Sequence, residues 1–137
     1  MTLDKSTERY RVLFVCTGNI CRSPTAEGVF RTLVTDAGLD DRIEAASAGV
    51  QGYHIGDPPD SRATAAAAAR GYNLAGQSAR RVAASDFLAF DLIVGIDLGH
   101  IEHLQRALWM IPPCLRRTDK VCVLPGQHRP EGIEVPD

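Results

Sequence analysis

The feature that most constrains this chain is an apolar run that ends in a cysteine and is followed by a short loop and a helix start. Residues 12–15, Val-Leu-Phe-Val, have the composition of a buried strand, and Cys16 follows them directly. Further on, Ser23-Pro24 is typical of a helix start with serine at the N-cap and proline at the first helical position. The sequence therefore predicts a strand, a loop and a helix with Cys16 at the carboxyl end of the strand.

The loop between this cysteine and the helix has the composition of an anion site. Gly18 and Asn19 are the residue types that most easily take positive φ, which lets a short loop curl with its N–H groups turned inward. The helix start adds unsatisfied N–H donors and the positive end of its dipole. Arg22 can hold two oxygens of a phosphate in a fork. We therefore expect phosphate or another oxyanion to bind there.

A thiol beneath such a loop is placed for nucleophilic chemistry. The positive field of the loop favours the thiolate, which is the reactive form of cysteine. Taken alone, a cysteine at a strand end is more often a small buried apolar residue. The spacing of Cys16, Arg22 and Ser23 around a loop with glycine and asparagine favours the catalytic interpretation.

Composition excludes several classes of protein. The chain has 137 residues, which predicts one domain, and its formal net charge of -2 argues against a nucleic-acid partner. No apolar run approaches the length of a membrane span, and residues 1–11 lack the apolar core of a signal peptide. The four cysteines form no C-x-x-C and have no histidine at zinc spacing. We expect a cytoplasmic protein with free thiols, without a metal or cofactor and without a membrane partner.

Strand and helix patterns alternate along the chain. Expected strands lie at 11–16, 42–47, 91–97 and 120–124, and expected helices at 24–37, 60–70, 85–90 and 99–110. An apolar stripe on the first helix comprises Ala26, Val29, Phe30, Leu33 and Val34. The alternation predicts a parallel sheet with right-handed crossovers and helices on both faces. Ligands bind such sheets at the carboxyl ends of the strands, where Cys16, Ser47 and Asp97 should converge.

The stretch Cys16-Thr17-Gly18-Asn19-Ile20-Cys21-Arg22-Ser23 resembles the Cys-x5-Arg-Ser signature of the low-molecular-weight protein-tyrosine phosphatases. The resemblance continues through Ser47-Ala48-Gly49, Asp57-Pro58-Pro59-Asp60-Ser61-Arg62, Ala79-Arg80-Arg81-Val82 and Phe90-Asp91-Leu92-Ile93. It implies a three-layer α/β fold with a four-stranded parallel sheet in the order 2-1-3-4. We expect residues 1–137 to form a single domain of this kind, with a loose leader at 1–10 and an irregular tail at 125–137.

The resemblance also implies roles for individual residues. Cys16 would attack the phosphorus and form a phosphocysteine, Arg22 and the loop residues Thr17, Gly18, Asn19, Ile20, Cys21 and Ser23 would hold the phosphate, and Asp137 would be the general acid. Ser23 would also assist the thiolate as a leaving group. Ser47 would brace Asn19 through a hydrogen bond, and Asp97 would support the loop from a neighbouring strand or act only as a strand-end cap. Tyr53 and His54 would form the substrate rim or be incidental loop residues.

Other features of the family bear on specificity and regulation. Isoleucine at position 20 is associated in the family with phosphotyrosine, whereas threonine there is associated with phosphoarginine. Cys21 would form a reversible disulfide with Cys16, or be a packed thiol behind the loop. The chain departs from the family at Gln77 or Ser78, where many members have histidine. It also ends at Asp137, without the Pro-Tyr-Tyr and the C-terminal helix of the family.

Three functions follow from these residues. The leading prediction is a metal-independent phosphatase acting on phosphotyrosine-containing proteins. An arsenate reductase of the same fold is an alternative, although it needs relay cysteines and residues 72–100 contain none. The third is a phosphate-binding form weakened by loss of the C-terminal segment.

Overall fold

The computed structural model describes residues 9–96, 98–108 and 120–123 of the chain. Its elements are β1 (Tyr10–Cys16), α1 (Arg22–Asp36), β2 (Ile43–Gly49), α2 (Ser61–Ala69), α3 (Asp86–Ala89), β3 (Leu92–Gly95), α4 (Leu98–Leu108) and β4 (Val121–Val123). Each end of these helices and strands lies within about two residues of the end expected from the sequence. Asp97 and Asp137, as well as the expected tail at 125–137, lie outside the described residues.

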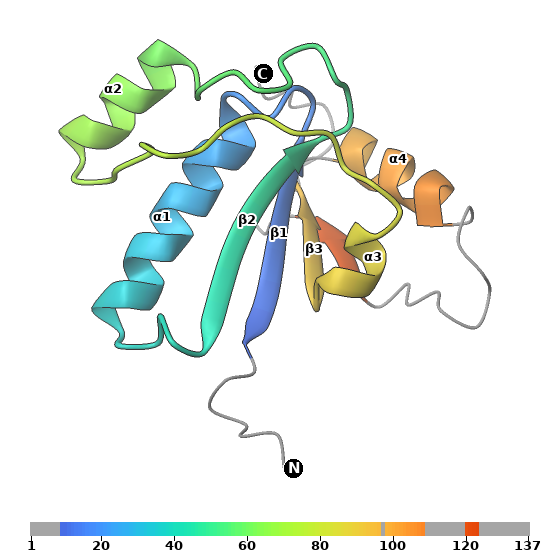
Figure 1. Ribbon diagram of the computed structural model, residues 1–137, viewed down its shortest axis with the longest axis horizontal. Helices are drawn as coiled ribbons and strands as arrows, with labels where there is room; N and C mark the ends of the chain where they lie inside the picture. Colours follow the sequence, from blue (N-terminus) through green and yellow to red (C-terminus); the bar gives the residue numbers. More distant parts are fainter. Residues whose placement is uncertain (1–8, 97, 109–119, 124–137) are drawn as a thin grey trace, which may run out of the picture.

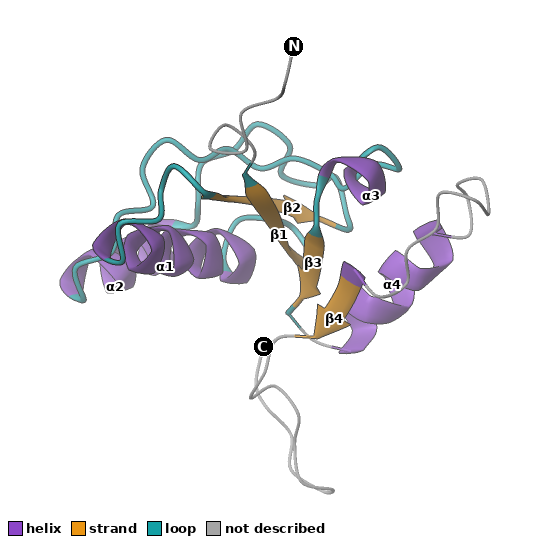
Figure 2. Cartoon of the chain, turned by 90° about the horizontal axis from the view of Figure 1, so that it is seen from below, coloured by secondary structure: helices purple, strands orange, loops and turns teal. Residues whose placement is uncertain are grey.

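The four strands form one parallel sheet in the order β2-β1-β3-β4, as predicted (Figure 1). Parallel neighbours require crossover connections, and the helices supply them. Helices α1 and α2 lie on one side of the sheet, and α3 and α4 lie on the other (Figure 2). The protein is thus a three-layer α/β structure, and the loop after β1 emerges at the carboxyl edge of the sheet.

Each face of the sheet has its own apolar cluster. Val12, Phe14 and Val94 face α1, where Phe30 packs edge-on against Phe14 with ring centroids 5.5 Å apart. The opposite face buries the larger cluster, which contains Leu13, Val15, Ala48, Val50, Phe87, Phe90, Ile93 and Leu104. Because successive β1 residues alternate between these clusters, the strand is buried on both faces, as its unbroken apolar run predicts.

Two local predictions about α1 are wrong. Ser23 is not the N-cap: the helix begins at Arg22, its N-cap is Cys21, and no side chain caps it. The Ser23 hydroxyl is instead 2.9 Å from the thiol of Cys16. Leu33 was expected on the buried stripe but is 55% exposed, whereas Glu27 and Gly28 are buried. The helix therefore turns a partly polar face toward β2, where Glu27 accepts a hydrogen bond from Ser47.

Among the described residues, none of the helices has the length and apolar character needed to cross a membrane.

Candidate active site

The loop formed by residues 16–23 connects β1 to α1, and its carbonyl groups are anchored to the surrounding chain. Cys16 and Thr17 accept hydrogen bonds from the N–H groups of Val50 and Gln51, each at 2.9 Å. The carbonyl of Ile20 accepts from Asp60, and that of Cys21 accepts from Thr25. The backbone of the 16–23 loop is therefore held from outside by the segments that follow β2 and begin α2.

This anchoring fixes the direction of the loop N–H groups. In a trans peptide, the C=O of one residue points opposite to the N–H of the next. Because the carbonyls of residues 16, 17 and 20 point toward their donors, the N–H groups of Thr17, Gly18 and Cys21 point away from those donors. Within the described part of the chain, the N–H groups of residues 17–21 donate to no protein acceptor. Such a set of aligned donors is the geometry of an anion-binding nest.

The thiol of Cys16 lies beneath this loop, in contact with the first turn of α1. Cys16 is 3% exposed, and its Sγ is 2.9 Å from Ser23 Oγ, which is itself fully buried. Asn19 Nδ2 donates to the same Ser23 oxygen at 2.9 Å. Since the Asn19 amide occupies an acceptor site of the hydroxyl, the hydroxyl proton is left for the sulfur or for the Ala48 carbonyl, which is farther away at 3.5 Å. Ser23 can thus donate a hydrogen bond to a thiolate at position 16.

Asn19 holds the loop in an uncommon backbone conformation. Its φ is 59°, in the left-handed region, which costs free energy for a residue with a Cβ. Its buried side chain offsets that cost with three hydrogen bonds: Nδ2 donates to Ser23 and to Ser47, each at 2.9 Å, and Oδ1 accepts from the N–H of Arg80 at 3.0 Å. The Asn19–Ser47 bond is the contact that the family resemblance implies.

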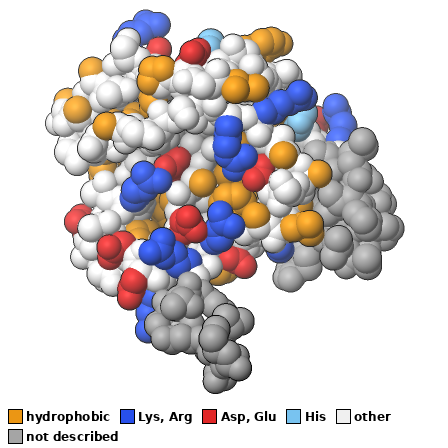
Figure 3. Space-filling view, in the orientation of Figure 1, with side chains coloured by type: hydrophobic (Ala, Val, Ile, Leu, Met, Phe, Trp, Pro, Cys, Tyr) orange, Lys and Arg blue, Asp and Glu red, His pale blue; other side chains and the backbone are white. Residues whose placement is uncertain are grey.

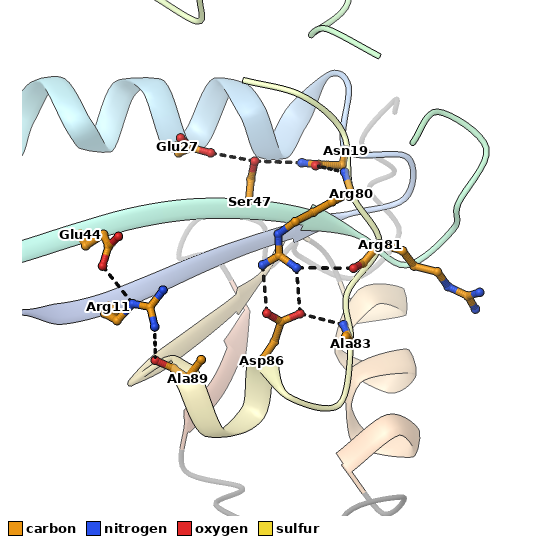
Figure 4. A network of polar contacts seen from close by, with 10 residues as sticks. All are labelled: Arg11, Asn19, Glu27, Glu44, Ser47, Arg80, Arg81, Ala83, Asp86 and Ala89. Carbon is orange, nitrogen blue, oxygen red and sulfur yellow. Dashed lines mark hydrogen bonds and ion pairs between the residues drawn. The ribbon is translucent and has the colours of Figure 1, made fainter. Parts of the chain in front are cut away.

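Behind Ser47 lies a buried carboxylate that the sequence did not reveal. Ser47 donates to Glu27 Oε1 at 2.8 Å (Figure 4). Glu27 also pairs with Arg31, one turn along α1. Burial raises the pKa of Glu27, while the Ser47 hydrogen bond and the charges of Arg31 and Arg80 act in the opposite direction. Gln77, one of the two residues at the place where many family members have histidine, donates to the Pro24 carbonyl at 3.0 Å and lies 3.5 Å from Ser47.

The Arg80 segment supports the loop from the other side. The guanidinium of Arg80 forms two hydrogen bonds to Asp86, at 3.0 and 3.1 Å, and Asp86 also accepts from the N–H of Ala83 at 2.7 Å (Figure 4). Asp86 is 6% exposed. The pair fixes the turn that leads into α3, and this turn presents the Arg80 N–H to Asn19.

Gly49, at the end of β2, lies directly against the loop. A Cβ added there would be 2.8 Å from the carbonyl oxygen of Thr17 and 3.0 Å from the nitrogen of Asn19. Those neighbours are backbone atoms, so they cannot move without moving the loop. A glycine is therefore required by the close approach of the two segments.

Two histidines contact the loop from outside. His100, on α4, is 5% exposed, and its Nε2 is 3.0 Å from Thr17 Oγ1. His54 lies beside Gly18, where an added Cβ would be 3.0 Å from its ring, and its Nδ1 is 3.4 Å from an Asp57 carboxylate oxygen. Tyr53 is 77% exposed. The carboxyl edge of the sheet thus brings His54 next to the loop and leaves Tyr53 in solvent.

The comparisons with known proteins agree with this geometry. A family model described as low molecular weight phosphotyrosine protein phosphatase matches residues 11–137. The chain belongs to that family. It is 50% identical over 115 residues to a low molecular weight protein-tyrosine-phosphatase of Streptomyces coelicolor, a match that covers 84% of this chain and 67% of that protein.

Two solved structures resemble the chain. The crystal structure of YfkJ from Bacillus subtilis has a TM-score of 0.77 and 37% identity, and covers 84% of this chain and 69% of that one. The structure of a Drosophila arginine phosphatase has a TM-score of 0.75 and 30% identity, covering 82% and 69%. In sequence, the match to YfkJ spans 60% of that protein, less than two thirds of its length.

The structure brings together most of the predicted site residues. The loop and helix start contain Cys16, Thr17, Gly18, Asn19, Ile20, Cys21, Arg22 and Ser23. Ser47 lies beneath them and bonds to Asn19. The thiol of Cys21 is exposed, and the structure has Cys16 and Cys21 as free cysteines. Asp97 and Asp137 lie outside the described residues, so the expected loop support and general acid stay predictions.

Proposed function

We propose that the protein is a metal-independent protein-tyrosine phosphatase that hydrolyses phosphotyrosine through a phosphocysteine intermediate. The observation that carries this proposal is the Cys16–Ser23 contact of 2.9 Å beneath a loop whose amides are turned away from their neighbours. Family membership supports the same reaction.

In the first step, Cys16 attacks the phosphorus of the substrate. The loop N–H groups and the Arg22 guanidinium match the charge that spreads over three phosphoryl oxygens in a loose transition state. The sulfur–phosphorus bond forms as the bond to the tyrosine oxygen breaks. We assign protonation of the leaving phenolate to Asp137.

In the second step, water attacks the phosphocysteine, and Asp137 takes the proton. The sulfur leaves as a thiolate, which the Ser23 hydroxyl stabilises by donating a hydrogen bond. Asn19 acts as a positioning residue in both steps, because it holds the Ser23 oxygen and the loop backbone at once. We assign loop support from the neighbouring strand to Asp97.

The substrate rim is proposed to consist of Tyr53 and His54. His54 lies next to Gly18, and an exposed aromatic one residue away can flank a phosphotyrosine ring. Ile20 is half-buried beside Gly18 and supports phosphotyrosine rather than phosphoarginine as the substrate. The protein partners implied are phosphotyrosine-containing proteins, and we infer that they are cytoplasmic.

Hydrolysis of p-nitrophenyl phosphate and of phosphotyrosine and phosphoarginine peptides in the presence of a chelator tests the proposal. Turnover should persist without metal, favour phosphotyrosine, and disappear in Cys16→Ser, while Ser78→Ala, an exposed serine near the loop, should keep full activity. Reduction of arsenate by the protein with a thiol donor would instead favour the arsenate reductase. Vanadate binding without any turnover would favour a phosphate-binding protein.

A further inference from the structure

An exposed arginine, Arg81, lies beside the candidate active site. Arg81 forms a parallel bridge with Gly49, and Gly49 is in turn the register partner of Cys16. Neighbouring strands lie about 4.8 Å apart, so the Arg81 backbone is about 10 Å from that of Cys16. Arg81 is therefore near the mouth of the site without being part of the 16–23 loop.

The Arg81 side chain is directed differently from that of its neighbour. Arg80 is tied to Asp86, whereas Arg81 is exposed and, in the part of the chain that the structure describes, makes no ion pair. Figure 4 shows its guanidinium pointing away from the Arg80–Asp86 pair. Its Cδ lies 3.8 Å from the position of a Cβ on Gly52, in the loop that carries Tyr53 and His54. The charge thus lies beside the proposed substrate rim.

A second exposed arginine, Arg106 on α4, adds to this positive charge. The Arg106 side chain is 79% exposed. Arg106 follows His103 by three residues on α4, so the two side chains are neighbours on the helix surface. Burial, and then the charges of Arg81 and Arg106, lower the pKa of His103. One acid offsets them in part: Glu102 is 4.0 Å from Arg106. Figure 3 shows Lys or Arg side chains beside a histidine at the upper right, where Figure 1 places α4.

We propose that Arg81 and Arg106, here called the basic flank, bind anionic side chains close to the phosphotyrosine in the substrate sequence. This inference rests on the proposed function. The anionic group can be a carboxylate of Asp or Glu or the phosphate of a second phosphotyrosine, since guanidinium groups pair with both.

The spacing predicts which substrate position is read. An extended peptide advances about 3.3–3.6 Å per residue, so 10 Å corresponds to about three residues. With the phosphate above Cys16, an acid about three residues from the phosphotyrosine lies level with Arg81. Arg106, on α4, would meet acids farther along the chain.

The size of the effect follows from exposure. Both guanidinium groups are in solvent, and exposed ion pairs contribute about 0.2–1 kcal/mol, which corresponds to at most about a five-fold change for each arginine. The interaction should weaken at high ionic strength, because exposed charges are screened by salt. The basic flank thus contributes to the choice among substrates and leaves the chemistry at Cys16 unchanged.

The test compares phosphopeptides that differ at one position. Three peptides carry Glu, Gln or a second phosphotyrosine three residues from the target phosphotyrosine, with matched sets on its N-terminal and C-terminal sides. They are assayed with wild type, Arg81→Gln, Arg106→Gln and the control Arg70→Gln. Arg70 is another exposed arginine, at the end of α2, on the opposite side of the sheet from α4 (Figure 2).

Arg81→Gln should lower kcat/KM about two- to five-fold for the anionic peptides only, and Arg106→Gln should lower it less, because the added charge lies level with Arg81. The Gln peptide and p-nitrophenyl phosphate should be unaffected, Arg70→Gln should change nothing, and high salt should remove the preference. A preference for the Glu peptide identifies a carboxylate, and a preference for the doubly phosphorylated peptide alone identifies a phosphate. Equal rates for all three peptides with wild type, or equal losses on all substrates in Arg81→Gln, would overturn the proposal.

Failure of the phosphatase activity is distinguished by a binding measurement. Cys16→Ser, with and without Arg81→Gln, is titrated with the same peptides by fluorescence anisotropy. If wild type has no turnover but Cys16→Ser binds the anionic peptides more tightly in an Arg81-dependent manner, the proposed function fails and the basic flank stands. If turnover is normal and binding ignores the added charge, the basic flank fails and the proposed function stands.

Discussion

Asn19 donates a hydrogen bond to Ser47 over 2.9 Å, which joins the 16–23 loop to the end of β2. Ser47 donates onward to Glu27, so the chain of contacts runs from the loop through β2 to a buried carboxylate on α1. Each donor in this series has a defined acceptor, and this fixes the orientation of the Asn19 amide. The left-handed backbone at Asn19 thus depends on a residue far away in the sequence.

Replacing Ser47 with Ala should therefore damage both stability and catalysis. The buried Asn19 amide loses an acceptor, and Glu27 loses a donor, at a cost of about 1–3 kcal/mol in the free energy of unfolding. We expect kcat/KM for p-nitrophenyl phosphate to fall about ten-fold as the loop loses its brace. Urea denaturation and steady-state kinetics measure the two effects. Exposed Ser78→Ala is the matched control, and a Ser47→Ala enzyme as active as this control would contradict the proposed role.

The buried carboxylate predicts an unusual dependence of stability on pH. Because burial raises the pKa of Glu27 above its ordinary value of 4.5, the folded state keeps the proton at a pH where the unfolded state has lost it. Between these two pKa values, the contribution of Glu27 to stability falls as the pH rises. Relative to Glu27→Gln, which keeps an acceptor for Ser47, wild type should lose free energy of unfolding as the pH is raised from about 4.5.

Urea denaturation at a series of pH values measures this difference. A matched control is Glu102→Gln, since that side chain is 70% exposed and should give a profile parallel to that of wild type. Parallel profiles for Glu27→Gln and wild type would show that burial does not govern the Glu27 carboxyl.

The sequence predicted the parts of the fold and site that depend on contiguous residues. The strand before Cys16 is an unbroken apolar run, and Gly18 and Asn19 favour a curled loop because both residue types readily take positive φ. The strand order and the Asn19–Ser47 bond came from the family resemblance, because pairing between distant segments has no local signal. The preference of serine for the N-cap position was misleading at Ser23, because its hydroxyl contacts the Cys16 thiol and does not cap the helix N-terminus.

Other residues that support the active-site loop could not be found from local sequence patterns. Glu27 and Arg31 have the spacing of an ordinary exposed pair on a helix, and only packing against β2 buries the carboxylate. His100 lies in a helix with several polar residues, and its contact with Thr17 depends on where α4 is placed. These residues show their roles only when the sheet brings their elements together.

Gly49→Ala should reduce activity more than stability. The added methyl group would be 2.8 Å from the Thr17 carbonyl oxygen, so the loop backbone must shift. Displacements of this size in a catalytic site can cost about 100-fold in rate, and we expect a loss of that order in kcat/KM. Gly71→Ala is the control, since Gly71 has a positive φ of 88° and open space around it. It should lower stability by about 1–2 kcal/mol and leave the activity of the folded enzyme intact; similar kinetics for both variants would refute the close-approach argument.

Thr17→Val should separate the His100 contact from the shape of the side chain. Valine keeps the volume of threonine but cannot bond to His100 Nε2, which is 3.0 Å from the threonine hydroxyl. We expect a loss of about 0.5–1.5 kcal/mol in the free energy of unfolding, together with weaker inhibition by vanadate as the loop loosens. Thr17→Ser keeps the hydroxyl and should restore both. If Thr17→Ser behaves like Thr17→Val, the methyl group and not the hydrogen bond is what matters.

The Asp86 carboxylate should influence the active site only through the Arg80 segment. Asp86→Asn removes the charge opposite Arg80 and one of the acceptors for its guanidinium, while one side-chain oxygen stays available to the Ala83 N–H. We expect the free energy of unfolding to fall by about 1–3 kcal/mol, and vanadate affinity to fall less than in Ser47→Ala, because the Arg80 N–H that holds Asn19 belongs to the backbone. Asp36→Asn, an exposed acid at the end of α1, should change stability by no more than about 0.5 kcal/mol. An Asp86→Asn protein as stable as this control would mean that the turn into α3 is held by packing alone, with the buried Phe87 as its anchor.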